Sequence, residues 1–466
     1  MFLRYSIADI HRQYEDGSLD PMSIAEECIA RVDQFNPKYH AWVNFDGDSL
    51  RRSAREAKAS LELKKPLRAL EGIPIGIKDV FNTSEFPTEM GSEIWKGFTP
   101  GNDARVVYYL KNAGGLIAGK TVTAEFAVHA LNETLNPHNV DFTPGTSSSG
   151  SAVAVSLGMV PVALGTQTGA SILRPASFCG IYGFKPSFGL LPRTGSLKTT
   201  DSLDTVGFFL ANPIDLKRVF DILRVHGPNF PISYKALKNQ ARQTKLKNRA
   251  WNIALVKTHT WAHAADYAKK SFLEFADKLD NVDGVEVTEL TLPLEFERTH
   301  EIHAAIYDKS LSYYFAEEQR QSERISSVMT EMIERGSKIS SEKYYQSLQT
   351  QEQLISIMDS IMENYDACIC LSTAGDAPKR NVMELPDPSL MWTLMHLPAL
   401  NVPMFVSPSG LPYGVQIISR KYNDYLLLNF VKYLVDLGFL PNRPTPIGDL
   451  SFLNHRADSS LKRNAL

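Results

Sequence analysis

Two loops rich in serine and glycine interrupt the apolar sequence between residues 141 and 207, and they constrain the fold more than any other feature. The first loop, PGTSSSGSA (144–152), continues into VAVSLGMVPVALG, and the second, TQTGAS (166–171), continues into ILRPASFCGIYGFKP. Glycine and other small residues allow sharp turns and close backbone approach. Such loops in apolar surroundings predict backbones packed tightly around a site, with N–H groups facing a ligand.

The rest of the chain alternates between helical and strand-like patterns. Apolar residues recur every three or four positions in residues 6–62 and in most of 295–364, which predicts helices. Short β-branched runs predict buried strands at 72–80, 116–122, 251–256, 365–371 and 413–419. This alternation predicts an α/β fold in which helices cover both faces of a central twisted mixed β-sheet.

Composition and charge exclude several classes of protein. Hydrophobic residues make up 43% of the 466 residues and charged residues 22%, as in an ordinary globular protein. The formal net charge of −3 provides no field for nucleic acid, and the six basic residues in 235–249 lack aromatic neighbours that would stack on bases. No run approaches ~18 apolar residues, so we expect no membrane span. Four scattered cysteines and the lack of a signal-peptide pattern predict a cytoplasmic protein.

Three familiar motifs do not fit their usual context. Residues 114–121 match the phosphate-loop pattern GxxxxGK[ST], but a helical pattern precedes them and their middle resembles a strand, so we regard the match as accidental. Neither serine loop contains the G-x-S-x-G of an α/β-hydrolase. Cys179 lies in an apolar segment that is typical of buried, unreactive cysteine.

A single lysine, Lys78, stands in the apolar strand predicted at 72–80. Burial penalises an ammonium and lowers its pKa, so a neutral Lys78 could activate a serine, which is a weak nucleophile until a base removes its proton. Asp79 should point to the opposite face of the strand and so need not stabilise the charge of Lys78. Each feature alone fits ordinary packing, but the lysine and both serine loops together predict a serine nucleophile with a lysine base.

Four segments together resemble the amidase signature family. They are GIPIGIKDVFNT (72–83), AGGLIAGKTVTAEFA (113–127), TPGTSSSGSAVAVSLGMVPVALGTQTGAS (143–171) and RPASFCGIYGFKPSFG (174–189). They follow the order and spacing of the family, and the TQT start of the second serine loop is similar to one of its subgroups. Residues from about 220 to 390 show little resemblance.

The resemblance implies an amidase that hydrolyses a small-molecule carboxamide through an acyl-enzyme. Lys78 falls on the catalytic lysine of the family, Ser171 on its nucleophile, and Ser147 on the proton-shuttling serine that follows a cis peptide bond. The oxyanion hole falls on the backbone N–H groups of Thr168, Gly169, Ala170 and Ser171. The implied reaction needs no metal and no organic cofactor.

Both serine loops depart from the common family pattern. Thr146 and Ser149 stand where glycines are usual, and Ala170 replaces a glycine before the nucleophile, where a positive φ would be costly. Arg174 lies three residues after Ser171, one later than is most common, and its expected role is to anchor the turn through an ion pair.

Two other functions stay open on these residues. The chain could be an amidotransferase-type subunit that transfers an acyl group or ammonia together with partner proteins. It could also be a catalytically silent family member that serves as a binding or assembly subunit, as the altered glycines suggest. The candidate walls of a substrate pocket are Met90, Glu125, Tyr307 and Trp392, although packing is the commoner role for the tryptophan.

We expect one domain over residues 1–466, and a homodimer would agree with the family. Its expected parts are N-terminal helices at 6–62, a catalytic core at 65–220, a mostly helical substrate-side region at 221–390 and a C-terminal α/β return at 391–466.

Overall fold

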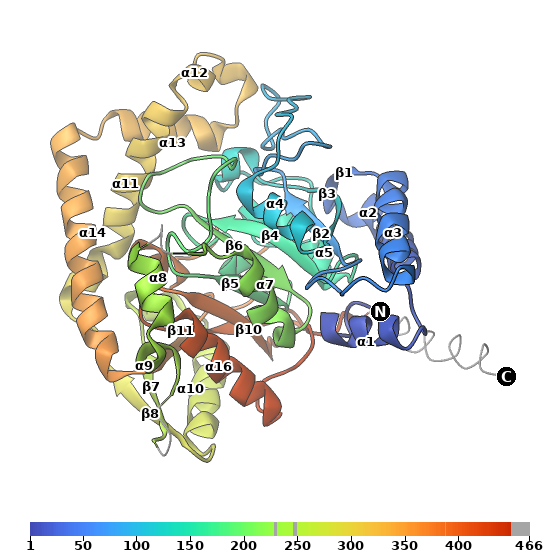
Figure 1. Cartoon of the computed structure of the whole chain (residues 1–466). Coiled ribbons are helices and arrows are strands. Elements are labelled where there is room, and N and C mark those ends of the chain that lie inside the picture. Colours follow the sequence, from blue (N-terminus) through green and yellow to red (C-terminus); the bar gives the residue numbers. More distant parts are fainter. Residues whose placement is uncertain (228–230, 246–248, 387, 449–466) are drawn as a thin grey trace.

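An eleven-stranded sheet forms the centre of the computed structural model (Figure 1). The structure describes residues 1–227, 231–245, 249–386 and 388–448. The strands follow the order β1-β3-β2-β4-β6-β5-β10-β11-β9-β7-β8 across the sheet. Their bounds are β1 (Trp42–Phe45), β2 (Pro74–Lys78), β3 (Leu116–Thr121), β4 (Val162–Gln167), β5 (Tyr182–Lys185), β6 (Thr205–Leu210), β7 (Trp251–Val256), β8 (Val285–Leu290), β9 (Ala367–Leu371), β10 (Ala399–Val406) and β11 (Pro412–Ile418).

Neighbouring strands pair in both directions, which confirms the predicted mixed sheet. β2 runs parallel to β3 and β4, and β7 runs parallel to β8 and β9. β1 is antiparallel to β3, β6 is antiparallel to β4 and β5, and β10 and β11 continue the antiparallel pairing from β5 to β9. The two parallel groups thus stand at either side of an antiparallel centre.

Helices flank the sheet, as expected, and the largest group of them comes from the variable region. Figure 1 shows α11, α13 and α14 together on one side of the molecule, with α2 and α3 on the opposite side beside β1. The helices of the described residues are α1 (Ile7–Glu15), α2 (Pro21–Tyr39), α3 (Gly47–Glu62), α4 (Arg105–Asn112), α5 (Ser149–Ser156), α6 (Leu173–Phe178), α7 (Leu216–Leu223), α8 (Pro231–Lys238), α9 (Gln240–Gln243), α10 (Asp266–Asp280), α11 (Thr299–Tyr314), α12 (Ala316–Gln319), α13 (Ser327–Ser337), α14 (Ser341–Ile361), α15 (Ser389–Leu394) and α16 (Asp424–Asp436). Two short 3-10 turns matter for the site, η1 (Glu125–Ala127) and η2 (Thr146–Ser148).

Residues 42–45 correct the prediction that the whole of 6–62 is helical. α2 ends at Tyr39, its C-cap His40 takes a left-handed φ of 48°, and the chain then enters strand β1. Trp42 is buried, and its backbone N–H donates to Asn36 Oδ1 at 2.9 Å. The aromatic and β-branched residues of WVNF favour a strand over another helical turn.

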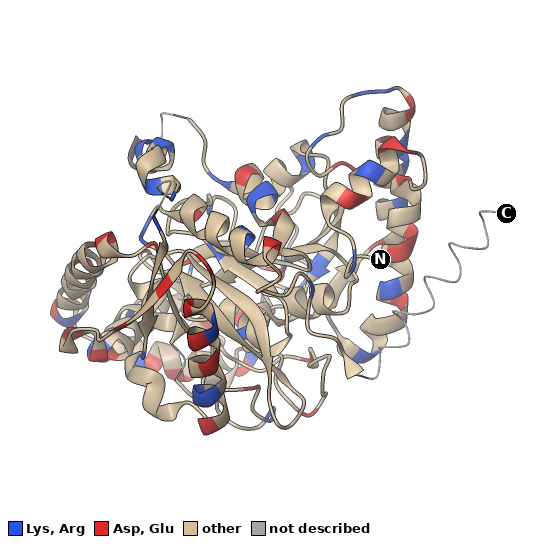
Figure 2. Ribbon diagram, turned by 90° about the horizontal axis from the view of Figure 1, so that it is seen from below, with Lys and Arg blue, Asp and Glu red and all other residues tan. Residues whose placement is uncertain are grey.

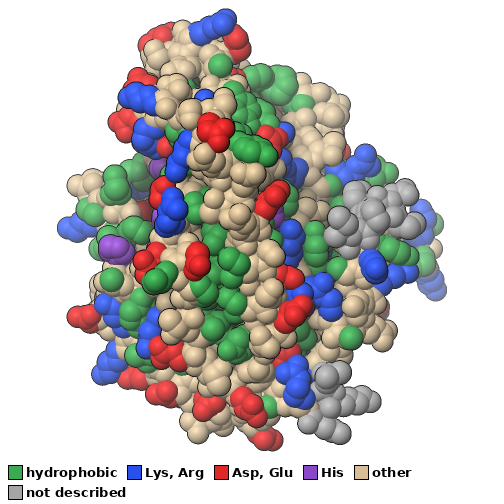
Figure 3. All heavy atoms as spheres, turned by 90° about the vertical axis from the view of Figure 1, so that its left-hand side faces the viewer, with side chains coloured by type: hydrophobic (Ala, Val, Ile, Leu, Met, Phe, Trp, Pro, Cys, Tyr) green, Lys and Arg blue, Asp and Glu red, His purple; other side chains and the backbone are tan. Residues whose placement is uncertain are grey.

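The long helix α14 shows how the variable region meets solvent. Its buried residues, Ser347, Gln351, Leu354 and Met358, recur every three or four positions and so form one narrow stripe. Figure 3 looks at this side of the molecule and shows apolar side chains between charged ones. In the view of Figure 2, basic and acidic residues are interspersed along the helices. No helix within the described ranges is both long enough and apolar enough to cross a membrane.

Candidate active site

Lys78 is the last residue of β2, between β3 and β4. Its side chain is fully buried, and its Nζ donates hydrogen bonds to Ser147 Oγ at 2.7 Å and to Thr166 Oγ1 at 2.8 Å. Burial lowers the pKa of Lys78 well below its ordinary value, and the charge of Asp204 opposes that shift. Since both contacts are neutral hydroxyls, the lysine is placed to act as an uncharged base beside a serine.

The loop that carries Ser147 forms the 3-10 turn η2 in front of α5. Gly145 precedes the turn at a φ of 85°, and a Cβ there would lie 2.7 Å from the backbone of Pro175, so this position requires glycine. The described residues contain no cis peptide bond, so the cis bond expected before Ser147 is wrong for this structure. The left-handed Gly145 and the 3-10 turn that follows bring the Ser147 hydroxyl to Lys78 through trans bonds instead.

Ser171 lies in the turn between β4 and α6 and is partly exposed. Among the described residues its hydroxyl has no hydrogen-bond partner, so the structure joins Lys78 to Ser147 but shows no bond from either to Ser171. Ala170 is absent from the residues with positive φ, so the alanine fits this turn without strain. A Cβ on Gly169 would meet nothing closer than the His303 ring, at 3.8 Å.

The two peptide groups before Ala170 are held through their carbonyls. His303 on α11 donates from Nε2 to the Thr168 carbonyl at 2.8 Å, and Thr393 on α15 donates from Oγ1 to the Gly169 carbonyl at 2.7 Å. Burial lowers the pKa of His303 to about 4, so its imidazole is neutral near pH 7, with the proton on Nε2. The backbone N–H groups of Gly169, Ala170 and Ser171 donate to no described acceptor and can receive an oxyanion.

Asp204 anchors the threonine side chain of the same turn. Its carboxylate accepts hydrogen bonds from the hydroxyls of Thr168 at 2.9 Å and Thr199 at 2.6 Å, and from the backbone N–H of Thr199 and Thr200. Arg193 lies 3.6 Å from the same carboxylate. This largely buried charge is therefore satisfied by its own neighbours, and the hydrogen bonds of Lys78 go to hydroxyls and not to this carboxylate.

Asp79 faces away from Lys78, as its place in the strand predicts. Its Oδ1 lies 2.8 Å from Nζ of Lys120, a second fully buried lysine on β3. Lys120 also donates to the Pro87 carbonyl and the Thr88 hydroxyl, each at 2.8 Å. Lys120 belongs to the phosphate-loop pattern at 114–121, and its position within a strand agrees with the interpretation of that match as accidental.

Arg174 and Thr146, two departures from the family pattern, both contact the carboxylate of Glu384. Arg174 forms an ion pair with Glu384, which confirms the anchoring role expected for this arginine. Thr146 donates from Oγ1 to the other oxygen of Glu384 at 3.0 Å. Ser149 receives a hydrogen bond from Asn132 Nδ2 at 2.9 Å. The side chains that replace glycines in the first loop therefore have partners in this fold.

The four candidate pocket residues lie in different surroundings. Met90 is buried in the wall of an apolar pocket, and Glu125 accepts a hydrogen bond from the backbone N–H of Ser326 at 2.8 Å. The Tyr307 ring is buried edge-on to His303, with ring centroids 5.7 Å apart. Trp392 is fully buried and donates from Nε1 to Cys370 Sγ at 3.3 Å. Tyr307 thus contacts His303, which holds the turn of residues 168–171, the candidate nucleophile turn.

Two adjoining hollows lie just beyond the end of β2, where Val80 lines both of them. The smaller includes Thr166, Thr168 and Asp204 in its lining, so it reaches the nucleophile turn. The larger has a volume of about 300 Å³ and shares the wall formed by Val80, Ser196 and Leu197 with the smaller one. Its aromatic walls are Trp95, Phe98, Phe126, Tyr314 and Phe315.

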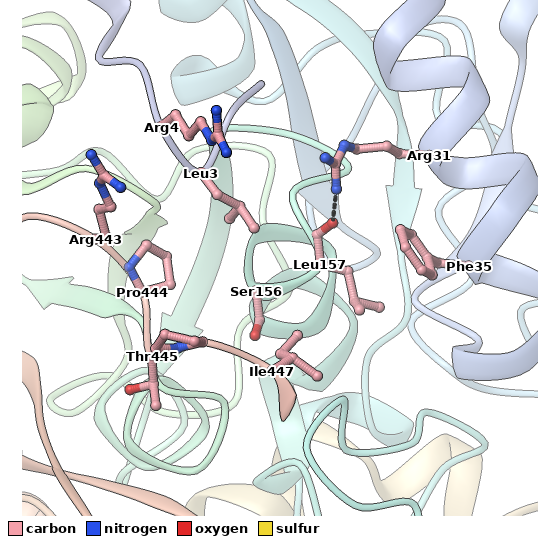
Figure 4. A pocket seen from close by; sticks show the side chains of 11 residues that line it. Leu3, Arg4, Arg31, Phe35, Ser156, Leu157, Arg443, Pro444, Thr445 and Ile447 are labelled. Carbon is pink, nitrogen blue, oxygen red and sulfur yellow. Dashed lines mark hydrogen bonds between the residues drawn. The ribbon is translucent and has the colours of Figure 1, made fainter. Parts of the chain in front are cut away.

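A further hollow of about 170 Å³ lies between the N-terminal segment, α2, α5 and residues 443–447. Figure 4 shows Arg4, Arg31 and Arg443 around it, with Arg31 donating to the Leu157 carbonyl at 2.9 Å. Neither serine loop contributes to its lining, so this hollow is not part of the site around Lys78.

Comparison with known proteins identifies the family of this chain. The Amidase family model matches residues 23–428. The chain belongs to the amidase signature family. A glutamyl-tRNA(Gln) amidotransferase subunit of Bdellovibrio bacteriovorus is 27% identical over 467 aligned positions, which cover 91% of this chain and 95% of that protein.

Solved structures of the amidase signature family share the fold. The crystal structure of an amidase superposes with a TM-score of 0.84 at 24% identity and covers 94% of this chain and 100% of that one. Native peptide amidase from Stenotrophomonas maltophilia superposes with a TM-score of 0.80 at 22% identity, covering 96% and 99% of the two chains.

Several residues that shape this amidase signature site were missed by sequence reasoning. Thr166 and Gln167 lie in the TQT segment, where strand alternation could have placed the Thr166 side chain toward Lys78. Asp204, His303 and Thr393 gave no local signal, because they reach the nucleophile turn from 36 to 224 positions away.

Proposed function

We propose that this chain cleaves the carbon–nitrogen bond of an amide through an acyl-enzyme on Ser171. The observation that carries the proposal is the contact of the fully buried Lys78 with Ser147. The hydrogen bonds of Lys78 go to hydroxyls, and no carboxylate among the described residues is bonded to it. A depressed lysine pKa supplies the base that a serine nucleophile needs at neutral pH.

The reaction begins when neutral Lys78 takes the hydroxyl proton of Ser147 and Ser147 takes that of Ser171. The Ser171 oxygen attacks the amide carbonyl, and the backbone N–H groups of Gly169, Ala170 and Ser171 stabilise the oxyanion, each by about 3 kcal/mol. Ser147 then protonates the leaving nitrogen, the carbon–nitrogen bond breaks, and Lys78 returns its proton to Ser147. Water, activated by the same relay, releases the acid from Ser171.

Two functions, a stand-alone amidase and an amidotransferase-type subunit, differ in what happens to the acyl group or the ammonia after the carbon–nitrogen bond breaks. A stand-alone amidase would hydrolyse a small carboxamide. The curated relatives favour the second function, because they are named as one of the subunits of a glutamyl-tRNA(Gln) amidotransferase and align with nearly the whole chain. In that case this chain would release ammonia from an amide donor and pass it on within a complex with partner proteins.

A catalytically silent role has less support from the geometry. Ala170 takes no positive φ, and Thr146 and Ser149 both bond to neighbours that suit them. The altered glycines therefore do not disrupt the loops that carry Ser147 and Ser171.

Intact-mass spectrometry after treatment with a small fluorophosphonate tests the shared chemistry. We expect one adduct on the wild type and none on Ser171→Ala. Ser149→Ala is a matched control, because its hydroxyl bonds to Asn132, and it should label like the wild type. A folded wild type without an adduct would contradict the proposed function.

Ammonia release separates the two fates of the product. The purified chain is supplied with glutamine or with small carboxamides, first alone and then with proteins that co-purify with it from its own cells. Release from carboxamides by the chain alone supports the stand-alone amidase. Release from glutamine that requires the co-purifying proteins supports the amidotransferase-type subunit.

A further inference from the structure

Two neutral side chains clamp the nucleophile turn on both sides. Gln167 Oε1 accepts hydrogen bonds from the backbone N–H groups of Ile172 at 2.8 Å and Leu173 at 3.0 Å. Its Nε2 donates to Thr393 Oγ1 at 2.9 Å, and the Thr393 hydroxyl donates to the Gly169 carbonyl at 2.7 Å. Gln167 and Thr393 are both buried, so these bonds are shielded from water.

We infer that Gln167 and Thr393 are positioning residues that fix the oxyanion-binding N–H groups of the nucleophile turn. This inference rests on the proposed function, because it assigns a purpose to donors that matter only if Ser171 is acylated. It adds two side chains to the residues that the family resemblance places in the site.

Peptide planarity explains how a bond to a carbonyl positions a donor. In a trans peptide unit the C=O of one residue and the N–H of the next point in opposite directions. The bond from His303 to the Thr168 carbonyl therefore sets the direction of the Gly169 N–H. The bond from Thr393 to the Gly169 carbonyl sets the direction of the Ala170 N–H in the same way.

The hydrogen bonds on the two sides of the turn need both a donor and an acceptor on the side chain at position 167. The Gln167 oxygen occupies the N–H groups that follow Ser171, while its nitrogen donates to the Thr393 oxygen and leaves the threonine proton for Gly169. A carboxylate at position 167 could accept the two backbone bonds but could not donate to Thr393. It would instead compete with the Gly169 carbonyl for the single Thr393 proton.

The experiment compares the rate of fluorophosphonate labelling at Ser171, across pH, in the wild type and three variants. Thr393→Val removes the hydroxyl at nearly constant shape, and we expect labelling to slow by about tenfold to hundredfold with an unchanged pH midpoint. Thr393→Ser should restore a rate within about threefold of the wild type, since it keeps the donor. Gln167→Glu should also slow labelling, because a carboxylate cannot donate to Thr393.

Thr350→Val is the matched control, because the Thr350 hydroxyl donates to the Gln346 carbonyl within α14. It should label like the wild type. A folded Thr393→Val that also labels like the wild type would overturn the inference. If Thr393→Val does not fold, the labelling rate of Gln167→Glu is the test, and an unchanged rate would overturn the inference. A folded wild type that does not label would contradict the proposed function itself. That outcome is distinct from the outcomes that overturn the inference on Gln167 and Thr393.

Discussion

Lys78 and Lys120 stand on neighbouring parallel strands, and both are fully buried, yet their partners differ in kind. Lys120 faces Ile77 across the pairing of β2 with β3, one position before Lys78. Lys78 Nζ meets two hydroxyls, whereas Lys120 Nζ lies 2.8 Å from the carboxylate of Asp79. The same sheet therefore holds one lysine that bonds to neutral hydroxyls and one in an ion pair.

Burial alone therefore does not make a lysine into a base. Burial lowers the pKa of both lysines, and for Lys120 the charge of Asp79 and its hydrogen bond oppose the shift. The charge of Asp79 favours the ammonium form of Lys120, and this ion pair ties β3 to the loop after β2. Lys78, with only hydroxyl contacts, is the one that can give up its proton and accept another from Ser147.

The largest expected effect comes from removing the unpaired lysine. Lys78→Met should slow fluorophosphonate labelling of Ser171 by about 10²–10⁴-fold, because general base catalysis typically contributes that much. The matched control removes the other buried lysine together with its partner, as Lys120→Met with Asp79→Leu. That double variant should label near the wild-type rate. Equal labelling rates in Lys78→Met and the wild type would contradict the role of Lys78 as the base.

The paired lysine should instead matter for stability. Lys120→Met alone leaves Asp79 buried without a counter-ion, and we expect the free energy of unfolding to fall by about 3–5 kcal/mol. Adding Asp79→Leu should recover most of that loss, since apolar replacement of a buried pair is often neutral. Urea unfolding of the two variants gives both values, and an equal loss in each would refute the assigned pairing.

A carboxylate placed beside Lys78 should favour its ammonium form, as Asp79 does for Lys120. Thr166→Asp puts an acid at the contact of Lys78 Nζ with Thr166 Oγ1, which favours the ammonium and raises the pKa of Lys78. Labelling at pH 7 should fall at least about tenfold, which corresponds to one pKa unit, and recover at higher pH. Thr166→Val serves as the control and should not move the pH midpoint upward. A Thr166→Asp profile that overlays the wild type would contradict this reasoning.

The smallest effect is expected at the first serine loop. Thr146→Gly restores the usual family residue and removes one hydrogen bond to Glu384, which should lower the free energy of unfolding by about 1–2 kcal/mol. The labelling rate should stay within about threefold of the wild type, because Ser147 and Lys78 keep their contact. A loss of labelling beyond tenfold would show that Thr146 shapes the relay directly.

Sequence patterns predicted those parts of the fold whose cause is local. Apolar runs indicated β2 and β7 close to their bounds, and three- and four-residue periodicity placed α14 within a longer helical stretch, 295–364. Strand β1 was missed since its four residues are stabilised by pairing with β3, across the sheet, and not by their neighbours in sequence. Alternation along the chain also predicted that Asp79 faces away from Lys78, but its partner Lys120 lies on another strand.

The candidate site also contains some residues that the sequence predicted and others that it did not. Lys78, Ser147 and Ser171 were candidates because a lone lysine and two serine loops are visible in the sequence. His303, Thr393 and Glu384 were not, because they lie outside the segments that resemble the family and meet the loops only in the folded chain. Long-range contacts to backbone carbonyls leave no periodic signal.

The pH dependence of fluorophosphonate labelling, measured on the wild type and on Lys78→Met, tests whether neutral Lys78 is the base that activates Ser171. We expect a wild-type rate that is low while Lys78 is an ammonium, rises as pH passes through its depressed pKa, and levels off below the ordinary lysine pKa of ~10.4. Lys78→Met should label slowly and without that rise. A wild-type rate that is still climbing at the ordinary lysine pKa, or the same midpoint in Lys78→Met, would contradict this role of Lys78.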